Sequence, residues 1–151
     1  MGNATKSLGT ASFAEGFSTV AVKTSSHSEG SNSFAYGLRS HAEGGHGTGN
    51  FLFLTGEDGS TIYSYKAPMI TDFNKYLGIL TSDYTHAAVI TDIDSQNKTI
   101  TVSETLGQLS NSGVTVYWGT AGGTGSHIEG FCTIATSDYS HVQGKWNVVD
   151  D

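Results

Sequence analysis

Small, apolar and polar residues recur at intervals of seven along both ends of this chain. The seven-residue units start at positions 5, 12, 19, 26, 33 and 40, and again at 126, 133 and 140. Each unit opens with Ser or Thr, and most carry Ala in third place and Gly in fifth. Gly and Ser favour turns, and the three residues between them suffice for a very short strand. The pattern therefore predicts a repeat protein built of short strands and tight turns.

The units alternate between two kinds. Those starting at 12, 26, 40, 126 and 140 carry Phe or His in second place and Glu or Gln in fourth. The other units carry mostly apolar residues there, namely Leu8, Val20, Val22, Phe34, Tyr36 and Ile134. A coiled coil needs large apolar residues at two places in every heptad, which these units lack. We therefore expect a narrow parallel β-solenoid of 14-residue coils, each rising by about 4.8 Å.

The period is broken between residues 45 and 125, where longer strands are expected. Strand patterns at 51–54, 61–65, 87–93, 98–103 and 114–118 predict a small antiparallel β-barrel or sandwich. Because the repeat resumes afterwards, this segment is expected to be a domain inserted in a turn of the solenoid. The predicted all-β chain thus has four parts: β-roll, 1–44; inserted β-domain, 45–125; β-roll, 126–147; start of a further downstream region, 148–151.

A coil this narrow has room inside only for small side chains. Strand alternation would place Ala14, Ala21, Ala35 and Ala42 in the interior, where they bury little surface. The second and fourth places would then point outward and form an apolar row, composed of Val20, Val22, Phe34, Tyr36 and Ile134. An exposed row of this kind favours a cyclic homo-oligomer. In the opposite phase, the same five residues would form the roll's own core.

Charge and composition argue against several classes of protein. A net charge of −7 without a stripe of Lys or Arg disfavours nucleic-acid binding. The sequence contains no run of 18 apolar residues, so we do not expect it to insert in a membrane. The single Cys132 excludes a disulfide framework within the chain.

Histidine and glutamate recur two residues apart in the polar units, and they should stack from coil to coil. The residues concerned are His27, Glu29, His41, Glu43, His127, Glu129 and His141. Imidazole and carboxylate groups suit Zn, Ni or Fe, so a metal ladder is one interpretation. A polar strand face with lateral hydrogen bonds is the interpretation we favour, so neither a metal nor another cofactor is expected. Adjacent Ser and His side chains point to opposite faces of a strand, so they are badly placed to form a hydrolytic triad. We therefore do not expect the chain to be an enzyme.

Aromatic residues of the inserted segment are candidates for ligand contacts, because aromatic rings stack on sugars and anchor interfaces. We single out Tyr63, Tyr65, Tyr84 and Trp118. Most aromatic residues of a small barrel pack in its core.

The Ser-x-Ala-x-Gly pentads at a period of seven resemble the left-handed parallel β-roll of YadA-like trimeric adhesin heads. The variant Ser40-His41-Ala42-Glu43-Gly44 is more similar to the version in phage and prophage tail-fibre or tail-appendage proteins. This resemblance implies a homotrimer in a virion tail or prophage particle, which binds a bacterial surface glycan or receptor. The inserted domain would be its recognition element. The alternatives are the head of a bacterial trimeric surface adhesin, and a glycan-degrading or metal-dependent enzyme whose site lies in the insert or between subunits.

Overall fold

The computed structural model describes residues 2–45, 50–66, 75–117 and 119–150. The chain forms two compact units, one made of Met1–Gly49 with Tyr117–Asp151 and one made of Asn50–Val116. In the described residues all regular structure is β-strand, without helix, so no helix there could cross a membrane. The predicted all-β class, with a parallel solenoid and a separate antiparallel domain, is confirmed.

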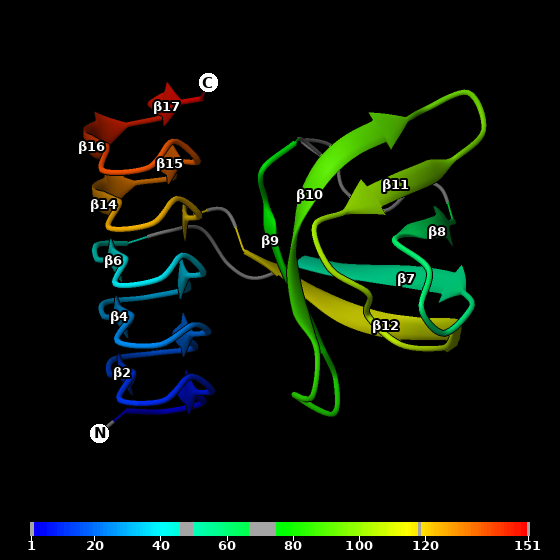
Figure 1. Cartoon of the computed structure of the whole chain (residues 1–151), viewed down its shortest axis with the longest axis horizontal. Coiled ribbons are helices and arrows are strands. Elements are labelled where there is room, and N and C mark those ends of the chain that lie inside the picture. The colour runs from blue at the N-terminus through cyan, green and yellow to red at the C-terminus, as the bar shows by residue number, and fades with distance from the viewer. Residues whose placement is uncertain (1, 46–49, 67–74, 118, 151) are drawn as a thin grey trace. The chain divides into compact units, whose positions relative to one another are not determined.

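The first unit is a roll of two parallel sheets (Figure 1). One sheet, called the apolar sheet below, has the order β1-β3-β5-β13-β15-β17. Its strands are β1 (Lys6–Ser7), β3 (Val20–Ala21), β5 (Ser33–Ala35), β13 (Gly119–Ala121), β15 (Ile134–Ala135) and β17 (Val148–Val149). The other, called the polar sheet, has the order β16-β14-β6-β4-β2. Its strands are β2 (Phe13–Ala14), β4 (His27–Ser28), β6 (His41–Ala42), β14 (His127–Phe131) and β16 (His141–Lys145).

Pairing between neighbouring coils follows the predicted 14-residue register. Val20 pairs with Phe34 in the apolar sheet, and His27 pairs with His41 in the polar sheet. The chain therefore alternates between the two sheets every seven residues, as the two kinds of unit require.

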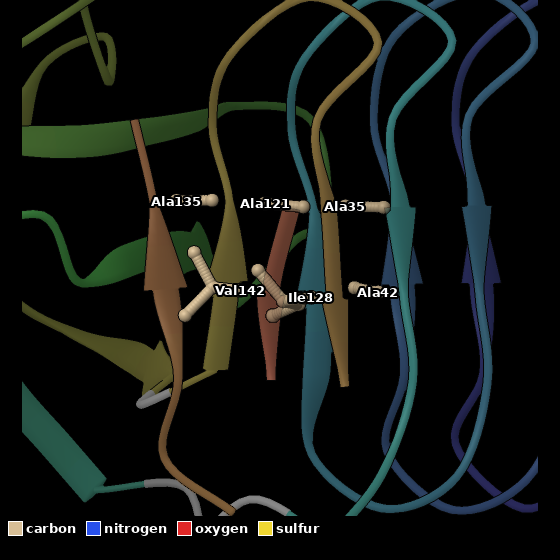
Figure 2. Close-up of a cluster of buried hydrophobic side chains, with 6 residues drawn as sticks. All are labelled: Ala35, Ala42, Ala121, Ile128, Ala135 and Val142. Carbon is tan, nitrogen blue, oxygen red and sulfur yellow. The ribbon is translucent and has the colours of Figure 1, made fainter. Parts of the chain in front are cut away.

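The interior of the roll is filled by third-place residues of both sheets. The buried cluster consists of Ala35, Ala42, Ala121, Ile128, Ala135 and Val142 (Figure 2). Ala21 is also buried and Ala14 is half-buried. The phase with alanine inside is therefore the one that the chain adopts, and second-place side chains point away from the interior.

Tight turns explain the Ser at the start of each polar unit. The Ser26 hydroxyl donates a hydrogen bond to the Lys23 carbonyl at 2.7 Å, and Ser40 does the same to Gly37 at 2.8 Å. Ser126 and Ser140 repeat this contact after the insert. The residue before each of these serines has a positive φ, as in Ser25 and Arg39. The hydroxyl thus satisfies a carbonyl where the chain reverses.

Five glycines stack in a row at the end of the polar units: Gly16, Gly30, Gly44, Gly130 and Gly144. Gly30 has a φ of 92°, and a Cβ atom there would lie 2.2 Å from the Gly44 carbonyl oxygen. Only glycine meets both demands, because L side chains rarely adopt this φ and no space exists for a Cβ.

The roll resumes earlier than the sequence predicted. Residues 119–125 were expected to belong to the insert, but Gly119–Ala121 forms β13 between β5 and β15. Val148 and Val149 were expected to begin a further region, but they pair with Ile134 and Ala135 as β17. The unit that starts at 119 has glycine in first and fourth places, which weakens the repeat pattern, although Ala121 in third place and Gly123 in fifth follow it.

The second unit is a closed antiparallel barrel of order β10-β11-β8-β7-β12-β9. Its strands are β7 (Asn50–Gly56), β8 (Ile62–Tyr65), β9 (Gly78–Thr81), β10 (Ala87–Asp94), β11 (Thr99–Val102) and β12 (Leu109–Tyr117). Aliphatic side chains such as Leu52, Leu54, Ile79, Ile90 and Ile100 are fully buried in this unit. Closure removes free sheet edges, so a short segment can form a stable domain.

Candidate functional site

Four imidazole rings form a continuous stack on the outward face of the polar sheet. His27 and His41 have ring centroids 4.6 Å apart, His41 and His127 also 4.6 Å, and His127 and His141 4.7 Å. Each pair of rings is within 9° of parallel. The spacing is that of neighbouring strands, so the backbone register itself holds the rings in line.

A row of carboxylates runs beside the histidines, two residues further along each strand. The shortest contact joins His41 Nε2 to Glu29 Oε1 at 3.0 Å, which is a hydrogen bond. Glu43 lies between two rings, with Oε2 3.7 Å from His41 Nε2 and Oε1 3.7 Å from His127 Nε2. Glu129 Oε1 is 3.8 Å from His141 Nε2. These four histidines with Glu29, Glu43 and Glu129 are called the His–Glu ladder below.

Burial and neighbouring charges shift the pKa values of the ladder in different directions. The hydrogen bond with the His41 ring lowers the pKa of Glu29. Desolvation by burial raises the pKa of Glu43, and hydrogen bonding with Glu129 and Glu29 adds to that rise. Burial lowers the pKa of His127, and the nearby His41 and His141 act in the same direction. His127 is therefore held neutral, with a free lone pair on its ring, more firmly than an exposed histidine would be.

An open groove follows the ladder along the sheet. It has a volume of about 560 Å³ and is lined by the carboxylate row and the glycine row. Because the glycines have no side chains, the carboxylates border a surface on which a cation or a small polar ligand could approach them.

Three sets of ligand atoms in the ladder could each hold one cation. The sets are His27 with Glu29 and His41, His41 with Glu43 and His127, and His127 with Glu129 and His141. Within each set the ligand atoms lie within 4.8 Å of one another. The serines adjacent to these histidines are directed elsewhere, since Ser26 and Ser40 donate to backbone carbonyls and are buried. The arrangement suits cation binding better than nucleophilic chemistry.

The apolar row predicted from the sequence lies on the outward side of the apolar sheet. Val20 and Phe34 are fully buried, Ile134 is 4% exposed, Tyr36 is 9% exposed and Val22 is half-buried. Phe34 stacks on Tyr36 at 6.2 Å and on Tyr117 at 5.1 Å. The expectation that the whole row is exposed in one chain is therefore wrong, although its direction away from the roll interior is as predicted.

The four aromatic residues proposed as ligand contacts differ in accessibility. Tyr63 is fully buried, so it cannot contact a ligand at the surface. Its hydroxyl accepts a hydrogen bond from Leu106 N at 2.8 Å and donates one to the Gly107 carbonyl oxygen at 2.9 Å. Tyr65 is half-buried, Tyr84 is 46% exposed, and Trp118 lies outside the described residues. Tyr84 is the member of this set that is best placed to meet a ligand.

A small polar pocket of the barrel was not predicted from the sequence. It has a volume of about 210 Å³, and its lining includes Asp83, His86 and Gln108. Asp83 Oδ1 accepts hydrogen bonds from the hydroxyls of Thr81 at 2.7 Å and Thr85 at 2.8 Å. These bonds lower the pKa of Asp83 to about 2. A Thr-x-Asp-x-Thr spacing could have indicated a turn closed by the Asp carboxylate, but not a pocket.

Comparisons with protein-family models, with curated proteins and with solved structures give no match to this chain.

Proposed function

We propose that this chain is a structural and receptor-binding module of a trimeric phage tail fibre or tail appendage. The roll would act as a rigid spacer, and the inserted barrel would be the recognition element. The observation that best supports this function is the opposite chemistry of the two outward faces of the roll. The polar sheet presents imidazoles and carboxylates to water, whereas the apolar sheet has exposed apolar side chains at its two ends, Leu8 just after β1 and Val148 in β17.

The roll favours assembly because its own core is thin. Alanine supplies four of the six residues in the interior cluster, and an alanine side chain buries little apolar surface. Larger apolar side chains at the two ends of the apolar sheet lie outside this core, namely Leu8 just after β1 at 40% exposure and Val148 in β17 at 49%. We therefore propose a homotrimer whose subunits meet along the apolar sheet, as the resemblance to YadA-like heads implies. The polar sheet would then face solvent.

The barrel is the better candidate for recognition because its loops carry varied side chains on a closed scaffold. The exposed Tyr84 lies directly beside Asp83 in the sequence, and Asp83 lines the polar pocket. An aromatic ring with neighbouring carboxylate, imidazole and amide groups is a combination that sugar ligands favour. Three copies in one particle would raise avidity for a repeated bacterial surface glycan.

The trimer is tested by sedimentation equilibrium or by light scattering coupled to gel filtration. The expected mass is three times the 15.9 kDa of one chain. A Val148→Asp, Leu8→Asp variant should dissociate the assembly, whereas Tyr139→Asp, at a residue that is 79% exposed outside the strands of both sheets, should not. A stable monomer at micromolar concentration would contradict this assembly.

The recognition role is tested on arrays of bacterial surface glycans and on whole cells. Binding that Tyr84→Ala abolishes, with the fold retained, would support the barrel as the recognition element. Release of soluble sugar from a bound glycan would instead favour the alternative of a glycan-degrading enzyme. Immunogold labelling would distinguish a virion tail from the surface of a bacterial cell, where the chain would serve as a trimeric adhesin head.

A further inference from the structure

The three metal-ligand sets of the His–Glu ladder overlap in a defined way. His41 belongs to the first and second sets, and His127 belongs to the second and third. Each set contributes two imidazole nitrogens and one carboxylate oxygen. Since each residue offers one ligand atom, a histidine shared between two sets can serve only one ion at a time.

Two ladder atoms are left without a hydrogen-bond partner in the described part of the chain. They are His27 Nε2 and His127 Nε2, and both are shielded from solvent at the atom itself. A buried polar atom without a partner is costly, so such an atom in a native protein calls for an explanation. His27 Nε2 belongs to the first set, and His127 Nε2 belongs to both the second and the third.

We propose that the His–Glu ladder binds two divalent transition-metal ions per chain, of the class of Zn²⁺. One ion would be held by His27, Glu29 and His41. The other would be held by His127, Glu129 and His141. The middle set, centred on Glu43, would stay without an ion because both of its histidines are already engaged.

The ligand chemistry selects this class of ion. Two imidazoles and a carboxylate suit Zn²⁺, Ni²⁺ and Cu²⁺, whereas Mg²⁺ and Ca²⁺ require mostly oxygen ligands. Zinc bonds to these atoms are about 2.0–2.2 Å long, so atoms now within 4.8 Å must each move by less than about 1 Å. These side chains are between 25% and 57% exposed and have room to rotate by this amount. Water or a second carboxylate would complete a tetrahedral site.

Charge repulsion also favours two ions over three. Ions in the first and third sets would be separated by two strand spacings, or about 9.6 Å, whereas neighbouring sets are about 4.8 Å apart. The former distance is close to the screening length at physiological salt, and the latter is well inside it. Alternate occupation therefore satisfies both the shared histidines and the repulsion.

The number of ions is measured by calorimetric titration of ZnCl₂ into the full chain, without a polyhistidine tag and after chelator treatment and gel filtration. The expected result is saturable binding of two Zn²⁺ per chain, with no heat of binding for MgCl₂. Elemental analysis after dialysis against trace zinc provides an independent count. Zero, one or three ions per chain would overturn the proposal.

Substitutions separate the ladder from other sites. Glu43→Gln should leave two ions, because the occupied sets do not need this carboxylate. His41→Asn should leave one ion, and the double variant His41→Asn, His127→Asn should leave none. His86→Asn, in the barrel, should leave two. Circular dichroism confirms that each variant retains the wild-type fold, and zinc binding that survives the double variant would contradict the assignment.

Discussion

The imidazole rings of His41 and His127 stack with centroids 4.6 Å apart and planes within 9° of parallel, although the whole barrel separates them in the sequence. Their strands β6 and β14 pair directly, with Ala42 opposite Ile128. The spacing equals that of His27 and His41, which belong to consecutive coils without an insert. The polar sheet is thus continuous across the insertion, and the roll does not need the barrel to complete its hydrogen bonds at this point.

Deleting residues 47–118 should leave a folded roll. Gly119 pairs with Ser33 at the first place of a unit, and position 47 is the next first place after Ser40. Joining His46 to Gly119 therefore keeps the seven-residue period without a gap. We expect the shortened chain to retain a β-type circular dichroism spectrum, a cooperative thermal transition and the oligomeric state of the parent chain.

A slightly longer deletion provides the matched control for this experiment. Removing 47–121 also removes β13, which pairs with both β5 and β15. That variant should lose cooperative unfolding or aggregate. If both deletions behave alike, the continuity of the apolar sheet across the insertion does not govern folding of the roll.

The coil length and the two kinds of strand could be predicted because each place in the unit has its own physical demand. Ser26 and Ser40 close turns, Ala35 and Ala42 fill a narrow interior, and Gly44 avoids a backbone collision. These demands recur in every coil, so they leave a regular mark in the sequence.

The return of the chain to the roll was missed because its first unit lacks the opening Ser or Thr, although Ala121 and Gly123 keep the third and fifth places of the pattern. β13 contributes hydrogen bonds and one interior side chain, Ala121, but it has Gly where other units have Ser. In the candidate site, spacing placed the histidines on one face but could not show which nitrogens would lack partners. The unpartnered nitrogens are set by the side-chain torsions of His27 and His127, and the local sequence does not determine these torsions.

Gly30→Ala should destabilise the roll strongly. Its φ of 92° disfavours an L side chain, and the added Cβ would lie 2.2 Å from the Gly44 carbonyl oxygen. Strain and backbone displacement together should cost about 3 kcal/mol or more. Thermal denaturation should show a fall in Tm of roughly 6 °C or more.

Gly37→Ala is the control for that substitution, because a Cβ there would lie 2.0 Å from the Gly123 carbonyl oxygen but the φ of Gly37 is not positive. The crowding is therefore matched, and the loss should be smaller because the alanine does not have to adopt a left-handed conformation. Equal losses for the two variants would show that crowding, and not backbone conformation, sets the cost.

Tyr63→Phe should destabilise the barrel without altering its surface. The Tyr63 hydroxyl is the partner of Leu106 N at 2.8 Å in the barrel core, and no water can replace it without opening that core. Leaving a buried N–H group unpaired costs about 1–3 kcal/mol. Urea denaturation should detect this loss, while glycan binding at temperatures where the barrel is folded should be unchanged. Lost binding by a fully folded variant would return Tyr63 to the set of ligand contacts.

Asp83→Asn should lower stability at neutral pH but not in acid. Hydrogen bonds from Thr81 and Thr85 lower the pKa of Asp83 from 3.8 to about 2 in the folded protein. The ionised carboxylate therefore stabilises the fold at pH values above 3.8, and this contribution shrinks as the pH falls and is lost below about 2. Because Asp83 is exposed, solvent screening limits the effect to about 0.5–1 kcal/mol. Urea denaturation at pH 7, 4, 3 and 2 should show the wild-type chain more stable than the Asp83→Asn variant at pH 7, with the difference shrinking towards zero in acid. A difference that stays constant from pH 7 to pH 2 would mean that the carboxylate charge contributes nothing and that the turn is held by geometry alone.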